Sequence, residues 1–156
     1  MPVRSEKVSG PELIPSGLFD DGIRGRLLTV ATELFAARGY HGVSVRDLTS
    51  PLGVKSSSLY AQFTSKEELY AELVFLANDQ IAGTLRAVPA RESAASLLRD
   101  LVTRYVEVHA TYPALARLAH NDLHVLSPAS LTRVSGSRRE ASGMFLAAIT
   151  QGNETR

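Results

Sequence analysis

The sequence has no cysteine, almost no net charge and no long run of apolar residues. The missing cysteines exclude disulfide bonds and cysteine-ligated metal centres, and they fit a reducing compartment such as the cytoplasm. Without a long apolar run or a charged-then-apolar leader, we expect neither a membrane-spanning nor a secreted protein. Hydrophobic residues make up 44% of the 156 positions, which is enough to build a folded core.

The sequence also lacks the signatures of common enzymes. It contains no nucleophile elbow, no phosphate-binding loop and no glycine-rich dinucleotide fingerprint. Many carboxylates lie at the starts of predicted helices, where capping explains them. No stretch alternates apolar and polar residues as a half-buried strand does. We therefore predict an all-α fold, no enzymatic activity and no cofactor.

Two short helices separated by a glycine are predicted within residues 44–63. Ser44 is a good N-cap, and Asp47 three residues later completes the pattern of a capping box. Gly53 ends the first helix, because glycine tolerates the left-handed backbone of a tight turn. The second helix is predicted from Ser56 to Phe63. This layout indicates a helix-turn-helix, whose second helix enters the major groove of DNA.

Apolar periodicity predicts further helices on both sides of this unit. The predicted ranges are 23–38, ending at Gly39; 65–88, opened by a second capping box of Ser65 and Glu68; 92–110; a short helix opened by Pro113; and a last helix opened by Ser127 and Pro128 that ends near Gly152. The helix over 92–110 is apolar on a wide face. We therefore predict that it lies at the centre of the core.

Four pieces of the sequence occur in an order and spacing that resemble a known family. They are ATELFAARGYHGVSVRDL at 31–48, LGV at 52–54, LYAQF at 59–63 and SKEELYAELV at 65–74. Taken together, the run from Leu27 to Leu73 resembles the DNA-binding domain of the tetracycline-repressor (TetR) family of bacterial regulators.

The resemblance implies a division of the chain and a function. It implies a flexible arm over residues 1–21, a helix-turn-helix DNA-binding domain over 22–66, and a helical ligand-binding and dimerisation domain over 67–156. The implied function is that of a cytoplasmic transcriptional repressor. Such a protein binds a palindromic double-stranded DNA operator as a homodimer, and a small-molecule effector releases it.

Ten side chains are candidates for DNA contact. Arg46 is placed on the outer side of the first motif helix, where a guanidinium can bond two acceptors of guanine or a phosphate. Gln62 can pair with adenine, and Ala61 can meet a thymine methyl group. Tyr60 and Lys66 match family positions that hold the DNA backbone. The full set is Ser44, Arg46, Lys55, Ser56, Ser57, Ser58, Tyr60, Ala61, Gln62 and Lys66.

Charge supports this interface, and two residues depart from the family pattern. Residues 24–66 carry six basic and two acidic side chains, which beside a helix-turn-helix favours a phosphate-facing patch. Pro51 falls in the last turn of the first motif helix, so we expect that helix to end early. Lys55 adds charge where a small capping residue is common. Arg4 and Lys7 in the arm could touch DNA, although a solvated tail is the simpler interpretation.

An effector pocket is predicted between the helix over 65–88, the helix over 92–110 and the last helix. The candidate lining residues are Phe75, Tyr105, His109, Tyr112, His120 and Met144, each of which could instead belong to the core. His120 and His124 lie four residues apart and would share a helical face, a spacing that can bind zinc. The residue after His120 is not the glutamate of zinc proteases, and no third ligand is evident. We predict no metal site.

Family members usually continue for two more long helices that form the dimer interface, and this chain lacks them, so we expect the domain over 67–156 to be partial.

Two other functions stay open on the sequence alone. A helical protein-interaction module that has lost DNA binding fits the short chain and a reading face with little arginine. A small helical enzyme that uses the histidines would bind a metal, and His120→Ala or His124→Ala would change its metal content.

Overall fold

The computed structural model of the protein describes residues 14–154, and within that range every regular element is a helix. The elements are α1 (Ile23–Arg38), α2 (Val45–Thr49), the short 3₁₀ helix η1 (Ser50–Leu52), α3 (Ser56–Tyr60), α4 (Lys66–Arg86), α5 (Ala94–Thr111), α6 (Pro113–His120), the 3₁₀ helix η2 (Leu123–Val125) and α7 (Pro128–Glu154). The predicted all-α class is confirmed. Arg4 and Lys7, with most of the predicted arm, lie outside the described residues.

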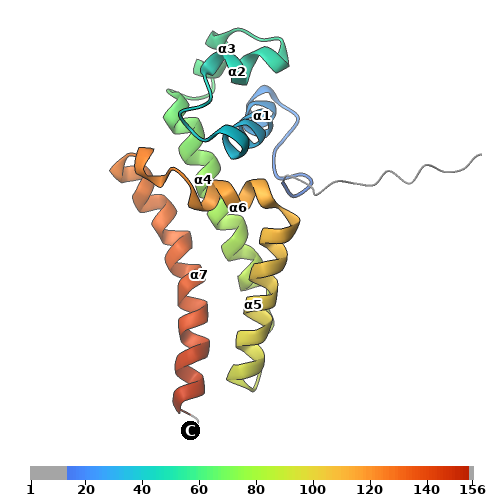
Figure 1. Ribbon diagram of the computed structural model, residues 1–156, viewed down its shortest axis with the longest axis vertical. Coiled ribbons are helices and arrows are strands. Elements are labelled where there is room, and N and C mark those ends of the chain that lie inside the picture. Colours follow the sequence, from blue (N-terminus) through green and yellow to red (C-terminus); the bar gives the residue numbers. More distant parts are fainter. Residues whose placement is uncertain (1–13, 155–156) are drawn as a thin grey trace, which may run out of the picture.

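The helices form an elongated molecule with two parts (Figure 1). Helices α1, α2 and α3 gather at one end, which we call the head, and α4 to α7 make up the rest, which we call the body. Helix α4 begins beside the head and runs down the body. One continuous core reaches from Leu27 in α1 to Ala148 in α7. In residues 14–154 we find no helix with the length and apolar character needed to cross a bilayer.

The head folds as its local signals predict. Helix α1 ends at Gly39, whose φ of 71° is in the region that favours glycine and whose N–H donates to the Phe35 carbonyl at 2.9 Å. The capping box before α2 is formed, since Ser44 Oγ accepts from Asp47 N at 3.1 Å and Asp47 Oδ2 accepts from Ser44 N at 2.8 Å. The Ser44 hydroxyl, at 2.7 Å, and the Ser44 N–H both donate to the Asp47 carboxylate and hold its pKa below the usual value. The entrance to the helix-turn-helix is therefore fixed by its own side chains.

Pro51 has the predicted effect on the first motif helix. Helix α2 ends at Thr49, and the chain continues as a 3₁₀ turn with the proline near its start. A proline ring has no N–H to give to the α-helical ladder, so the tighter turn is the accommodating structure. Gly53 then adopts φ 66° and ψ 24°, the left-handed conformation that the turn between the two helices needs.

The predicted length of the second motif helix is wrong. Helix α3 ends at Tyr60 instead of Phe63 and has five residues. The Gln62 carbonyl is taken by Arg24, whose Nη1 donates to it at 2.8 Å. Phe63 turns into the core and is only 2% exposed. Phe63 N still donates to Leu59 O at 2.9 Å, so the residues after Tyr60 form a turn that is contacted by Arg24 and closed by the buried Phe63 ring.

The predicted second capping box is half formed. Ser65 Oγ accepts from Glu68 N at 3.0 Å, as predicted. The Glu68 carboxylate accepts from the backbone N–H and the hydroxyl of Thr64 instead of from Ser65. The cap therefore reaches one residue further back along the chain.

The centre of the body is α4, which corrects the prediction for the helix over 92–110. Helix α4 contacts α5, α6, α7 and α1, and ten of its residues are buried. Helix α5 buries only Leu101 and Val108. Val102 and Val106, on the same wide apolar face, are 47% and 58% exposed. The apolar face of α5 is thus wider than the part of it that α4 and α7 cover. Periodicity alone does not reveal which part of such a face is buried against other helices.

Candidate nucleic-acid interface and ligand pocket

The predicted DNA-contacting side chains lie together at the free end of the head (Figure 1). Most of the set is exposed: Ser44, Arg46, Lys55, Ser56, Ser57, Tyr60 and Ala61. Ser58, Gln62 and Lys66 are half-buried. Tyr60 presents a phenol ring that is 55% exposed, although apolar rings of this size are usually covered. The surface is polar and basic and contains one exposed aromatic ring.

A buried set of apolar side chains positions α3 beneath this surface. Leu48 from α2 and Leu59 from α3 are fully buried, and Leu27 from α1 packs behind them. Arg24 contacts the residues that follow α3. Its guanidinium carbon lies 4.1 Å from the Phe63 ring centre, and its Nη2 lies 2.6 Å from Glu72 Oε2. Arg24 therefore holds the end of α3 in place, and its charge is already paired within the protein.

Lys66 has a structural role that the sequence did not suggest. Its Nζ donates to the carbonyls of Tyr40 at 3.0 Å and Val43 at 2.9 Å, and it lies 4.0 Å from the Tyr40 ring centre. Burial lowers the pKa of Lys66. The ammonium has three N–H groups, so one is left for another acceptor. Its contact with DNA stays a prediction, and its contact with the loop before α2 is a property of the fold.

Two hydrogen bonds join α6 and the segment after it to the head, and two more join that segment to α4. From the body, Asp122 Oδ2 accepts from Tyr40 N at 2.9 Å, and Arg117 Nη1 donates to Ala36 O at 3.2 Å. Along α4, Tyr70 donates its hydroxyl to Asn121 O at 3.0 Å, and Glu67 Oε1 accepts from Ser127 N at 3.2 Å. Burial, with the charge of Asp122, raises the pKa of Tyr70 above its ordinary range. The segment after α6 is thus attached directly to the loop that leads into α2.

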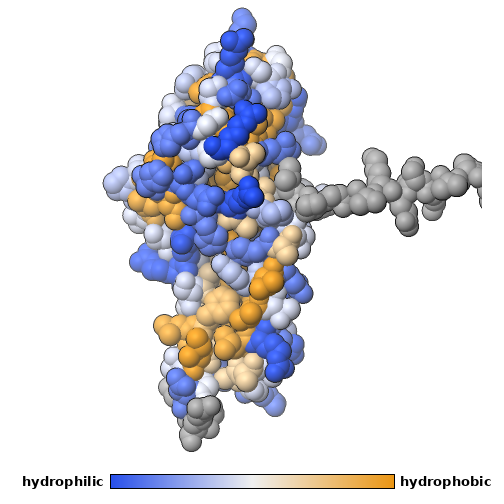
Figure 2. Space-filling view, viewed as in Figure 1, coloured by the Kyte–Doolittle hydropathy of each residue, from blue (hydrophilic) through white to orange (hydrophobic). Residues whose placement is uncertain are grey.

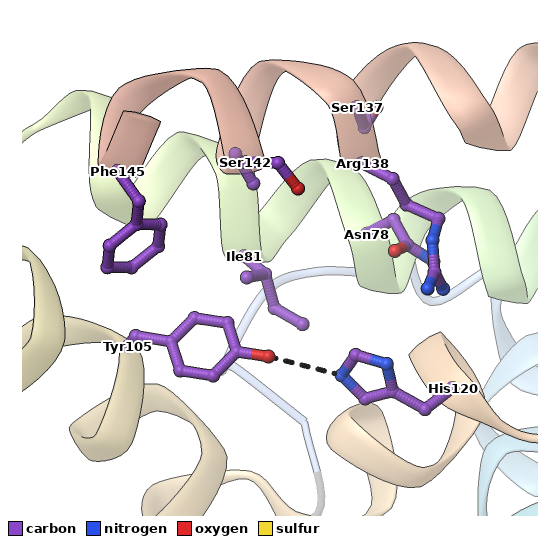
Figure 3. Close-up of a pocket in the computed structure, with 9 residues that line it drawn as sticks. Asn78, Ile81, Tyr105, His120, Ser137, Arg138, Ser142 and Phe145 are labelled. Atoms are coloured by element: carbon purple, nitrogen blue, oxygen red, sulfur yellow. Dashed lines mark hydrogen bonds between the residues drawn. The ribbon is translucent and has the colours of Figure 1, made fainter. Parts of the chain in front are cut away.

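A pocket of about 430 Å³ lies between α4, α5, α6 and α7 (Figure 3). Its lining includes two predicted residues, Tyr105 and His120. His109 lies behind them, with its Nε2 3.2 Å from His120 Nε2. The remaining lining residues, which sequence reasoning missed, are Asn78, Ile81, Ser137, Arg138, Ala141, Ser142 and Phe145.

Besides His109, three predicted pocket residues do not line this cavity. Phe75 lies under the Arg133 guanidinium, with 3.8 Å between the guanidinium carbon and the ring centre. Tyr112 sits at the junction of α5 and α6. Met144 packs against the core, while its neighbour Phe145 faces the cavity. One residue along a helix is a rotation of about 100°, so a prediction off by one position selects another face.

The pair His120 and His124 does not share a helical face, which corrects the prediction. Helix α6 ends at His120, and a 3₁₀ turn begins at Leu123. His124 lies near His41, with 6.1 Å between ring centres, while His120 stacks on His109. Among residues 14–154, no three His, Cys, Asp or Glu side chains come together in an arrangement that could hold a metal ion.

Comparison with known proteins identifies the head. Residues 27–73 match the sequence profile described as "Bacterial regulatory proteins, tetR family". The repressor KstR2 of Rhodococcus jostii is 30% identical over 133 residues, which are 84% of this chain and 65% of that protein. A tetR-family protein of Rhodococcus RHA1 has a solved structure that is 26% identical, with a TM-score of 0.80 over 85% of this chain and 70% of that one.

Residues 27–73 thus match the tetR-family profile, and the described chain shares the fold of this solved tetR-family structure. The structure of KstR2 from Mycobacterium tuberculosis, titled a ketosteroid transcriptional regulator, also superimposes with a TM-score of 0.76 at 25% identity, over 87% of this chain and 70% of that one. The activator FasR of Mycolicibacterium smegmatis is 36% identical over 66 residues, 42% of this chain and 30% of FasR. The chain thus covers 65% of the length of the Rhodococcus KstR2 and smaller shares of the shorter matches.

One of the missed pocket residues had a signal in the sequence. Asn78 interrupts the apolar stripe of α4, one residue after Ala77 and three before Ile81. It is 5% exposed, and its Nδ2 donates to Val74 O at 2.8 Å and Ala119 O at 3.3 Å. Amide side chains are mostly exposed in proteins, so a buried one within an apolar stripe is informative. Arg138 had no such signal, because α7 carries several other arginines.

Proposed function

We propose that the chain is a DNA-binding transcriptional regulator of the TetR type, acting as a repressor. The observation that carries the proposal is the group of exposed polar side chains on α2 and α3, held by a buried apolar set within a tetR-family domain. Tyr60 and Arg46 are both free to meet a duplex, the phenol at a phosphate and the guanidinium at a base or phosphate.

The proposal assigns the parts of the chain as follows. Residues 22–66 bind the operator, and residues 67–156 form part of a ligand-binding and dimerisation domain in the cytoplasm. Helix α3 is short, so one head presents few base contacts. Two heads bound to the halves of a palindrome would multiply the affinity of each, which is the physical reason for a homodimer. An effector that binds the body better in the DNA-free state releases the operator.

Footprinting of the DNA upstream of the gene, at two salt concentrations, tests this proposal. We expect protection of a palindrome that weakens steeply with salt, because bound cations release counterions. Arg46→Ala should weaken binding in a base-dependent way, and Tyr60→Phe should weaken it more uniformly. Arg104→Ala is the matched control, since Arg104 is exposed on α5 and pairs only with Glu107 at 3.2 Å.

A second candidate function is a helical protein-interaction module that has lost DNA binding. The observation in its favour is that two cations within residues 22–66 are already engaged, Arg24 with Glu72 and Lys66 with the loop before α2. A forced dimer, made by fusing the chain to a dimeric carrier, separates the two functions. Protection by the forced dimer supports the regulator, and continued absence of protection at low salt supports the interaction module.

A further inference from the structure

The pocket in the body has a polar end and an apolar end (Figure 3). Arg138 from α7, His120 from α6 and Asn78 from α4 converge on one side. Ile81 and Phe145 lie on the other side. A volume of about 430 Å³ is within the usual range for small-molecule sites. A ligand that fills the pocket must therefore be amphipathic.

The polar end is positively charged and contains no acid. Arg138 donates Nη1 to the Ala119 carbonyl at 2.8 Å, and no carboxylate among residues 14–154 lies within ion-pair distance of it. The imidazole of His120 lines the same end of the pocket, and His109 lies behind it, with 3.2 Å between the two Nε2 atoms. Burial, the charge of Arg138 and His109 all lower the pKa of His120, so the free site resists a further positive charge. Half-buried cations of this kind usually have an anionic partner.

A shallower hollow continues from the pocket at Arg138. Arg138 and Ser142 line both, and Ser135 and Arg139 complete the second hollow, which has a volume of about 330 Å³. The lining of this second hollow again contains hydroxyl and guanidinium groups and no carboxylate. Arg138 thus stands between the interior and the opening. An anion at that place can accept hydrogen bonds from the guanidinium and from the neighbouring hydroxyls.

We infer that this pocket binds an amphipathic anion, with an oxyanion head group against Arg138 and an apolar body between Ile81 and Phe145. A planar guanidinium with one N–H engaged keeps donors for two oxygens, which carboxylates and phosphate monoesters both supply. The inference rests on the proposed function only for the statement that this anion is the effector. The binding itself does not depend on DNA.

Calorimetric titration of the full chain with probes that share one decyl chain tests the inference. The probes are decanoate, decyl phosphate, the neutral decanol and the cationic decyltrimethylammonium. We expect at least one anion to bind about tenfold more tightly than decanol, because a charge-assisted hydrogen bond is gained, and the cation to bind no better than decanol. Decanoate and decyl phosphate distinguish the two oxyanions, and tighter binding of either supports the site.

Substitutions then locate the charge. Arg138→Met should reduce anion affinity about tenfold or more and leave decanol affinity unchanged. Arg104→Met removes the same charge from an exposed site on α5 and should change neither. Arg138→Lys should retain part of the preference. Circular dichroism shows whether each variant is folded, and the comparison of probes on the unmodified chain requires no variant.

Either of two results overturns the inference. One is equal affinity for the anions and decanol, or binding of none of the anions, by the unmodified chain. The other is an anion preference that Arg138→Met leaves intact in the folded variant. A preference for anions without operator binding in the footprinting experiment would leave the site standing and overturn only the regulatory function.

Discussion

Lys66→Met offers the sharpest test of how the head is built. The ammonium holds the carbonyls of Tyr40 and Val43 at 3.0 and 2.9 Å and lies over the Tyr40 ring. Methionine keeps the length and the apolar part of the side chain and removes all three donors. The two carbonyls lose their partner, and the loop between α1 and α2 loses its attachment to α4.

The expected loss follows from these contacts. A hydrogen bond from a charged donor contributes roughly 1.5–3 kcal/mol when buried, and a cation over an aromatic ring adds roughly 0.5–1 kcal/mol at exposed sites. Lys66 is half-buried, so water replaces part of each contact. Because water replaces part of each contact, we expect the free energy of unfolding to fall by about 2 kcal/mol. For a chain of this size, that loss lowers the Tm by about 4–8 °C.

Urea unfolding followed by far-ultraviolet circular dichroism measures this change. Lys55→Met is the matched control, since Lys55 is exposed and no side-chain bond caps α3 there, and it should stay within about 0.5 kcal/mol. A Lys66→Met value inside the same limit would refute the structural role. The salt dependence of operator binding is a separate readout, because Lys66→Met lowers the salt slope by about 1 if Lys66 contacts a phosphate.

Three further predictions concern single positions. Gly53→Ala should lower the free energy of unfolding by about 1–2 kcal/mol, because alanine is strained at the positive φ of this residue while its Cβ would meet nothing within 4 Å. Gly53→Asn should lower it less, and equal losses in urea unfolding would contradict this. Asp122 has φ 47°, so Asp122→Ala should lose the bond to Tyr40 N and strain the backbone, while Asp122→Asn keeps an acceptor and tolerates that φ; similar urea midpoints for the two would be contrary to the structure. The pKa of His120 is lowered in the folded state, so the free energy of unfolding should fall as the pH drops below the ordinary histidine pKa of about 6.5. His120→Gln should show a smaller fall between pH 7 and pH 5. Parallel curves of stability against pH would show that this histidine does not contribute.

Local chemistry made most of the head predictable. The end of α1 at Gly39, the cap at Ser44 and the early end of α2 before Pro51 each follow from a residue and its near neighbours. These signals act within one turn of helix, so no knowledge of the fold is needed to interpret them. The order of the helices followed in the same way.

The remaining features depend on partners that are distant in the sequence. The turn after α3 is held by Arg24, which lies 38 residues before the carbonyl it binds. The role of Lys66 depends on carbonyls 23 and 26 residues away. For the pocket, helical periodicity gave the helices, and only their rotation selects Arg138 and Phe145 over Met144. A pattern along one helix cannot supply that rotation, because the neighbouring helices determine it.

The bonds between head and body have a consequence for how such proteins can recombine. Asp122 and Arg117 reach the head through the Tyr40 amide and the Ala36 carbonyl, groups that every residue other than proline provides. These two bonds therefore depend on the shape of the head's backbone and not on its side chains, whereas Arg24 adds a side-chain contact from the head to Glu72. Reading residues such as Arg46 can diverge freely without loosening the joint. A chimera that places another head of the same backbone geometry on this body should keep both contacts, so that DNA specificity and ligand specificity can be inherited separately.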